Sequence, residues 1–280
     1  MLIINTLMAF LLIPLAELLY KSNFKLNNKY NYLTMILFFG ITSGIHVVLY
    51  LLTKNPQIKV NDIIIFFPIS FLYILSFMIN LKGLKNVKLS LNSPIINSYI
   101  IFPIILFIFF FSKKISHISY IGLVLIIISN ILLLFQNIKN NKYILYPIFS
   151  SLIFGFATFL SFIYIDKLSL IDKNNALLSF EITLFFFAIY SYLFLKINNV
   201  PLNIHNEKNN ILAAIILIIA QICYINVLNS NYKISTIILS IYFVLSIILA
   251  KFKLKEKITI KEFICSSFIA IGIILTLLSF

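Results

Sequence analysis

The sequence predicts an all-α integral membrane protein with ten transmembrane helices, on three observations. Of its 280 residues, 61% are hydrophobic and only 11% are charged, whereas soluble domains carry about 25% charged residues. Apolar runs long enough to cross a bilayer, roughly 20 residues each, recur along the whole chain. These runs lack the period-two alternation of a transmembrane β-barrel. Ten such helices would occupy about 200 residues, which leaves no room for an extramembrane domain.

The ten apolar runs are separated by short polar connections. The third and fourth runs are divided only by LKGLKNVK, and the eighth and ninth only by NSNYK. Each of these two pairs must therefore form a tight antiparallel hairpin. The spans are expected at residues 2–20, 32–53, 62–81, 89–111, 118–136, 143–165, 175–196, 209–229, 233–252 and 259–280.

The net charge of +14 reflects 22 basic residues, all of them lysine. In a soluble protein this excess would suggest a nucleic-acid partner. Here the lysines stand in the gaps between apolar runs, where they reach water and lipid phosphates. We therefore interpret them as membrane-surface anchors and expect no nucleic-acid partner.

Two stretches of the sequence repeat each other and divide the chain into halves, residues 1–137 and 138–280. Lys88-Leu89-Ser90 precedes the fourth span, and Lys114-Ile115-Ser116 follows it. Lys233-Ile234-Ser235 precedes the ninth span in the same way, and Lys257-Ile258-Thr259 follows it. Five spans per half is an odd number, so the second half must enter the membrane from the opposite face. The sequence thus predicts an inverted 5+5 repeat with a shared site near the midplane.

The same residues resemble a known family, the drug/metabolite transporter superfamily, and within it the ten-helix EamA-like transporters. NLKGLKNVKLSLNSPIIN, residues 80–97, is similar to the family's passage from helix 3 to helix 4. FKLKEKITIKEFICSSFIAIGIIL, residues 252–275, is similar to its closing segment, with a Leu-x-Glu-Lys turn containing Glu256 before a last helix with a late Gly272. The resemblance makes each half one EamA-like repeat and implies a central cavity lined by helices 3, 4, 8 and 9.

Neutral polar side chains on those four helices are the candidate cavity lining. Such groups cost less in a membrane than charges and hydrogen-bond a polar solute. The competing interpretation is that they join helices through interhelical hydrogen bonds. The candidate set is Tyr73, Phe77, Asn80, Ser93, Asn97, Tyr99, Gln221, Tyr224, Asn226, Ser235, Tyr242 and Ser246.

Ionisable residues within the spans are few. His46 and Glu181 are the candidates for proton coupling, because the unperturbed pKa of histidine is about 6.5 and a carboxyl group deep in a span is costly unless it is paired. The alternatives are a neutral, satisfied His46 and a Glu181 that reaches an interfacial lysine such as Lys173. Glu17 is expected to pair with Lys21, four residues later on the same helix.

Proline and glycine mark two further features. Pro68, Pro94 and Pro103 lie within the third and fourth spans, where each removes a backbone donor and favours a kink. Gly40 and Gly44 form a GxxxG step that indicates close helix packing within the bundle, with a dimer contact as the alternative.

No enzyme motif is present: the sequence lacks a phosphate loop, HExxH, GxSxG and CxxC. The three histidines are too dispersed for a metal site, and we expect no cofactor. An ATP-driven pump would need a nucleotide-binding domain. The sequence therefore predicts a secondary transporter of a small polar metabolite, an amino acid or related compound, working by alternating access and exporting it across the cell membrane. The alternatives are a flippase for polyprenyl-linked sugars and a non-transporting membrane scaffold. Its partners would be the substrate and the lipid bilayer, and a homodimer is left open.

The orientation in the membrane is the one feature on which two arguments disagree. The connections after odd-numbered spans carry 15 lysines and those after even-numbered spans carry 7. By the positive-inside rule both termini would lie outside, whereas the family resemblance implies that both lie in the cytoplasm.

Overall fold

The computed structural model describes residues 1–24, 30–54, 59–112, 115–138, 141–202, 204–229 and 233–279. Throughout these ranges the regular structure is helical, and ten helical segments are long and apolar enough to cross a membrane. The prediction of an all-helical protein with ten spans is confirmed in this form. The chain is therefore an integral multi-pass membrane protein by its architecture.

Seven of the ten spans are single uninterrupted α-helices, and three are composite. The uninterrupted ones are α1 (Leu2–Asn23), α2 (Asn31–Lys54), α3 (Val60–Asn86), α6 (His117–Asn137), α8 (Lys173–Ile197), α9 (Lys208–Asn229) and α12 (Ile260–Ser279). The composite ones are α4 (Leu89–Asn97) with η1 (Ser98–Ile100) and α5 (Ile101–Phe111), η2 (Lys142–Ile144) with α7 (Leu145–Phe162) and η3 (Ile163–Lys167), and α10 (Lys233–Ser240) with α11 (Phe243–Lys253).

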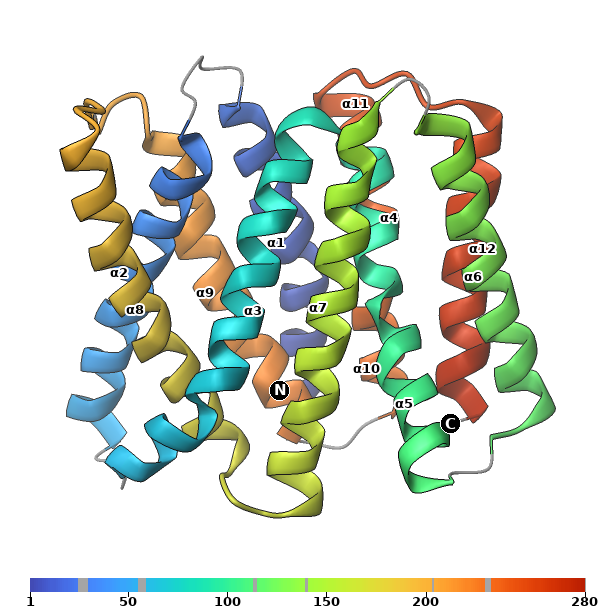
Figure 1. Ribbon diagram of the computed structural model, residues 1–280, viewed down its shortest axis with the longest axis horizontal. Helices are drawn as coiled ribbons and strands as arrows, with labels where there is room; N and C mark the ends of the chain where they lie inside the picture. The colour runs from blue at the N-terminus through green and yellow to red at the C-terminus, as the bar shows by residue number, and fades with distance from the viewer. Residues whose placement is uncertain are drawn as a thin grey trace.

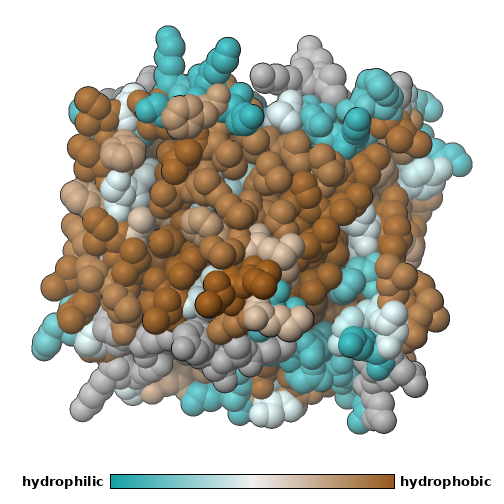
Figure 2. Space-filling view, turned by 180° about the vertical axis from the view of Figure 1, so that it is seen from behind, coloured by the Kyte–Doolittle hydropathy of each residue, from teal (hydrophilic) through white to brown (hydrophobic). Residues whose placement is uncertain are grey.

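The surface carries an apolar belt between two polar rims. Figure 2 shows hydrophobic side chains across the middle of one face, with hydrophilic ones gathered along its upper and lower edges. Large apolar side chains such as Ile45, Phe110, Ile121 and Phe186 are more than half exposed. Such an exposed band would be an aggregation hazard in water and is expected of a surface solvated by lipid.

The helices stand side by side, with both termini in the lower half of Figure 1. α1 packs on α9, α3 on α7, α2 on α8, α6 on α12 and α4 on α11. We call the upper end in Figure 1, where α1 and α3 end and the α11–α12 turn lies, the connection face. The opposite end is the terminal face.

Two spans are broken near their middles. In the fourth span the α-helix gives way to η1, and Pro103 lies just beyond it. Proline has no N–H to donate to the carbonyl four residues back, which is that of Tyr99. In the ninth span the break at Ile241 and Tyr242 is held by i→i+3 bonds such as Leu245 N to Tyr242 O, at 2.9 Å. No proline or glycine lies there. The helices continue through Pro68 and Pro94.

Glycines allow two helix pairs to approach closely. A Cβ on Gly122 of α6 would lie 2.6 Å from the carbonyl oxygen of Gly272 on α12. A Cβ on Gly40 of α2 would lie 2.5 Å from the Leu184 carbonyl oxygen of α8, and one on Gly44 would meet the Phe185 ring at 2.6 Å. The GxxxG step in α2 thus packs within the bundle, against α8.

Candidate functional site

The carboxylate of Glu17 on α1 is the centre of a polar cluster between the two broken spans. Ser93 Oγ of α4 and Ser246 Oγ of α11 donate hydrogen bonds to Glu17 Oε2 at 2.8 and 2.7 Å. The Tyr242 hydroxyl, at the break between α10 and α11, donates to Glu17 Oε1 at 3.3 Å. Three hydroxyl groups from two spans therefore converge on one carboxyl group supplied by a third.

Glu17 has no cationic partner among the residues that the structure describes. Lys21, expected to pair with it, turns away and donates to the carbonyl oxygens of Leu84 and Val87 at 2.6 and 2.7 Å. That expectation was wrong because two carbonyls at the end of α3, which no longer have partners within their own helix, attract the ammonium group. A carboxylate held this way can balance its charge with a proton or a cationic solute.

The amide side chains of α3 and α4 extend the cluster. Asn97 donates to the carbonyl oxygen of Ser93 at 2.8 Å, and its side chain also hydrogen-bonds Tyr242. Asn92 Nδ2 donates to Asn80 Oδ1 at 2.8 Å. The buried Oδ1 of Asn92 has no hydrogen-bond partner within the described part of the chain. α4 thus carries one row of polar groups past the carboxylate.

Below this cluster, toward the terminal face, lies a group of aromatic residues. The hydroxyls of Tyr99 and Tyr224 hydrogen-bond each other. The rings of Tyr73 and Tyr99 both pack edge-on against Phe154, with centroids 5.0 and 4.5 Å from it. Tyr73 is held by α7, with its hydroxyl 3.0 Å from Ser161 Oγ.

Most of these side chains lie deep in the bundle yet keep part of their surface accessible. Glu17, Tyr73, Tyr99, Tyr224 and Tyr242 are enclosed by the surrounding helices, and none of them is fully buried. These five side chains are therefore half-buried, unlike the fully buried residues of the apolar core.

Four predicted lining residues do not join the cluster. Phe77 packs with Tyr20 and Phe39 in an apolar core. Asn226 is exposed, because it lies about 200° around α9 from Tyr224 at 100° per residue. Ser235 is buried in α10, seven residues before Tyr242 and away from Glu17. Gln221 shares the Tyr224 side of α9, and its buried Oε1 has no partner within the described ranges.

The two residues predicted for proton coupling meet each other. His46 Nδ1 of α2 lies 2.8 Å from Glu181 Oε2 and 3.0 Å from Oε1 of α8. The Glu181 side chain is completely buried and that of His46 is 17% exposed. The hydrogen-bond partner of Glu181 in the described structure is thus His46. This pair is separate from the Glu17 cluster, on the helix pair that carries Gly40 and Gly44.

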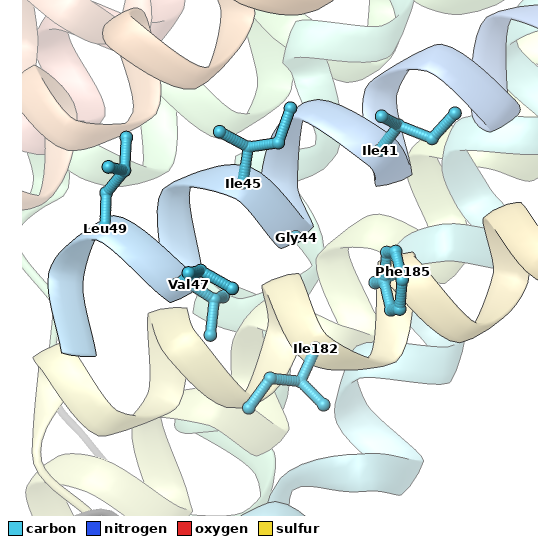
Figure 3. Close-up of a pocket in the computed structure, with 8 residues that line it drawn as sticks. Ile41, Gly44, Ile45, Val47, Leu49, Ile182 and Phe185 are labelled. Atoms are coloured by element: carbon cyan, nitrogen blue, oxygen red, sulfur yellow. The ribbon is translucent and has the colours of Figure 1, made fainter. Parts of the chain in front are cut away.

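An apolar groove of about 420 Å³ lies on the outer surface beside this pair. Figure 3 shows Ile182 and Phe185 of α8 next to the turn of α2 that carries Gly44 and Val47. Ile41, Ile45 and Leu49, which also line it, are exposed. The lining offers no side-chain hydrogen-bonding group to a polar solute, so the groove is no alternative to the interior cluster.

Three functional groups were missed by reasoning from the sequence. Glu17 was assigned to a local ion pair because Lys21 follows at the right spacing. Thr158 and Ser161, which lie against Tyr73, are on the sixth span, outside the four helices that the resemblance singled out. The available signal was that Glu17 is one of only three glutamates inside the predicted spans, with Glu181 and Glu262.

No protein-family model matches the chain, and no curated protein sequence matches it. Among solved structures, one described as "Crystal structure of protein" has a TM-score of 0.60 at 10% identity. The match covers 97% of this chain and 96% of that one. At 10% identity this similarity shows that the two chains share a fold.

Proposed function

We propose that this chain is a secondary carrier that exports a small polar metabolite bearing an amine, such as an amino acid or related compound, in exchange for protons. The observation that carries the proposal is the Glu17 carboxylate, held by three hydroxyls between two broken helices without a counter-cation in the described structure. A carboxyl group at such a depth is costly and is a functional candidate by default. Proton and substrate ammonium would occupy it alternately.

The aromatic residues suit the same cargo. Tyr73, Tyr99 and Tyr224 bring three aromatic rings and three hydroxyls close together below the carboxylate cluster. Aromatic rings attract ammonium groups, and neutral hydroxyls bind a polar solute without holding it too tightly for release. A site with one carboxylate and several such groups therefore favours a small cation or zwitterion over an anion.

An inverted 5+5 repeat, as in the EamA-like transporters of the drug/metabolite transporter superfamily, is part of the proposal. In a 5+5 repeat, each of the first five spans corresponds to the span five places later, so that α1 corresponds to α7 and α3 to α9. The contact between α1 and α9 then corresponds to the contact between α7 and α3, and both are present. The contacts α2–α8, α6–α12 and α4–α11 each join two corresponding spans. The two broken helices, the fourth and ninth spans, also correspond. Interrupted helices at matching places in two halves point to a transporter binding site.

The direct test is flux into proteoliposomes containing the purified chain. We expect a panel of labelled amino acids and amines to include at least one solute whose movement depends on a proton gradient. Glu17→Gln keeps the shape of the side chain but can hold neither a proton nor an ammonium charge. It should slow this flux by about tenfold or more, because losing one hydrogen bond to a charged group typically weakens binding by about that factor.

Glu207→Gln is the matched control. Glu207 is also largely buried, but it accepts from Asn23 and Asn210 near the connection face instead of facing the cluster. Its substitution should leave flux near the wild-type rate. If no water-soluble solute moves, and neither Glu17→Gln nor Tyr73→Ala with Tyr224→Ala changes any flux, the carrier proposal fails. Movement of a polyprenyl-linked sugar would favour the flippase.

A further inference from the structure

The connection face carries a second set of polar contacts, one helical turn above the Glu17 cluster. Glu256, in the turn between α11 and α12, accepts hydrogen bonds from the backbone N–H groups of Leu89 and Ser90 at 2.8 and 3.0 Å, and from Ser90 Oγ at 2.7 Å. These N–H groups open α4 and have no acceptor within their own helix. A carboxylate there also complements the helix dipole.

Lys21 makes the complementary contact at the end of α3. Its ammonium group donates to the Leu84 and Val87 carbonyl oxygens, which are among the last acceptors of that helix. Lys88 adds a contact to Glu262 at 3.2 Å and to the Lys257 carbonyl at 2.7 Å. Two glutamates and two lysines thus tie the α3–α4 turn to α1, to the α11–α12 turn and to the start of α12.

These contacts begin about one turn beyond the residues that build the Glu17 cluster. Lys21 follows Glu17 by four residues and Leu89 precedes Ser93 by four. The Glu256 N–H group donates to the carbonyl oxygen of Ala250, four residues after Ser246. Four residues make about one helical turn, or about 6 Å along the axis. The upper contacts therefore stand about one turn from the carboxylate, between it and the connection face.

The start of α4 is tightly packed at the end where Glu256 and Lys21 act. Leu89, Ser90 and Asn92 are all at most 4% exposed. A solute or probe reaching the cluster from the connection face would therefore have to displace these contacts.

We propose that Glu256 and Lys21, bound to the α3–α4 turn, form the closed gate of the connection face, and that breaking these bonds exposes Glu17 to that side. We call this set of contacts the turn latch. The proposal rests on the carrier function and gives a positioning role to the Leu-x-Glu-Lys motif. Glu256 and Lys21 do not touch the substrate.

Cysteine accessibility tests the turn latch without any need for transport. The full chain, with Cys223→Ala and Cys265→Ala, would be placed in lipid nanodiscs and treated with a membrane-impermeant maleimide. Asn92→Cys reports on the path above the Glu17 cluster and Gln221→Cys on the path below it. Glu256→Gln weakens the latch by removing the charge, and Lys21→Met weakens it independently at α3.

Each latch variant should raise the labelling rate of Asn92→Cys by about tenfold or more, the weight of one charge-assisted hydrogen bond. The same variants should lower the rate at Gln221→Cys, since alternating access closes one side as the other opens. Glu207→Gln should change neither rate, because Glu207 lies near the same face but accepts hydrogen bonds from Asn23 and Asn210. Glu256→Asp should restore part of the protection.

Two results would overturn the turn latch. One is unchanged labelling of Asn92→Cys in both latch variants. The other is faster labelling of both reporters together, which would indicate general loosening of the bundle. If the rates change as expected while the wild-type chain moves no solute in proteoliposomes, the latch stands and the proposed cargo is wrong.

Discussion

At the scale of single residues, the ionisable groups inside the membrane occupy two separate places with different surroundings. Glu17 is met by hydroxyls, whereas Glu181 is met by the imidazole of His46. In the first arrangement the carboxylate charge can be balanced by a bound proton or a cationic solute. In the second it can be balanced by the imidazole within the protein. This contrast makes Glu17 the stronger candidate for proton coupling. We expect the His46–Glu181 pair mainly to stabilise the fold.

The His46–Glu181 pair leads to a stability prediction. His46→Ala would leave a fully buried carboxyl group without its hydrogen-bond partner. Removing one member of a buried pair typically costs about 3–5 kcal/mol of folding free energy. We expect a clear fall in the thermal unfolding midpoint of the purified protein.

The double variant His46→Leu with Glu181→Met is the control, because replacing both members by apolar side chains is close to neutral in many buried pairs. It should recover most of the lost stability. A single variant as stable as the wild type, or a double variant worse than the single, would contradict the pairing. A loss of proton-driven flux in a stable double variant would instead return the pair to a coupling role.

At the scale of helices, close glycine packing occurs both away from the broken spans and at one of them. Glycine contacts join α6 to α12 and α2 to α8, and a Cβ on Gly155 of α7 would lie 2.6 Å from the Tyr99 carbonyl oxygen in the break of the fourth span. Tightly packed pairs are suited to act as rigid supports. Broken spans lack regular i→i−4 hydrogen bonds in their middle turns, so bending them breaks fewer hydrogen bonds.

Alanine substitutions distinguish the two kinds of glycine contact. In Gly122→Ala the new Cβ would stand 2.6 Å from a backbone oxygen of α12, so the two helices must move apart, at a cost of about 1–3 kcal/mol for overpacking. In Gly44→Ala the nearest atom belongs to the Phe185 ring, which can turn aside. We expect Gly122→Ala to lower the unfolding midpoint more than Gly44→Ala does. Equal losses would mean that these backbones adjust freely.

At the scale of the whole molecule, the lysines and the fold together define two different faces. The connection face carries the larger share of the lysines, as well as the turn latch, and both termini belong to the terminal face. Ten crossings require both termini to lie on the same side of the bilayer.

Reporters fused to each terminus test the orientation. We expect both to report the cytoplasmic side, as the resemblance to EamA-like transporters implies. Signals from opposite sides would contradict ten crossings. Signals from the outside at both ends would mean that the lysine distribution decides the orientation, and the connection face would then be cytoplasmic.

The sequence by itself determined the features that depend on composition and spacing along the chain. Apolar runs of span length predict ten helices, because an unpaired backbone cannot lie in lipid. The helices on which Tyr99, Tyr242 and Ser246 lie were chosen because the family resemblance implies a cavity between them. Which individual side chains line the site was harder to predict. Ser93 and Asn97 joined the cluster, whereas Asn226 did not, because the packing of neighbouring helices determines which side of α9 faces the interior.

Only the tertiary structure decided which polar groups meet. Glu17 has a lysine at i+4, and local spacing favours that pair. The carbonyl oxygens at the end of α3 bind Lys21 instead and leave the carboxylate to hydroxyls of the fourth and ninth spans. His46 and Glu181 are 135 residues apart, and nothing in local sequence pairs them. A polar group in a membrane is costly unless it has a hydrogen-bond partner. In this chain the partners come from spans that are distant in sequence and that the packing of the bundle brings together.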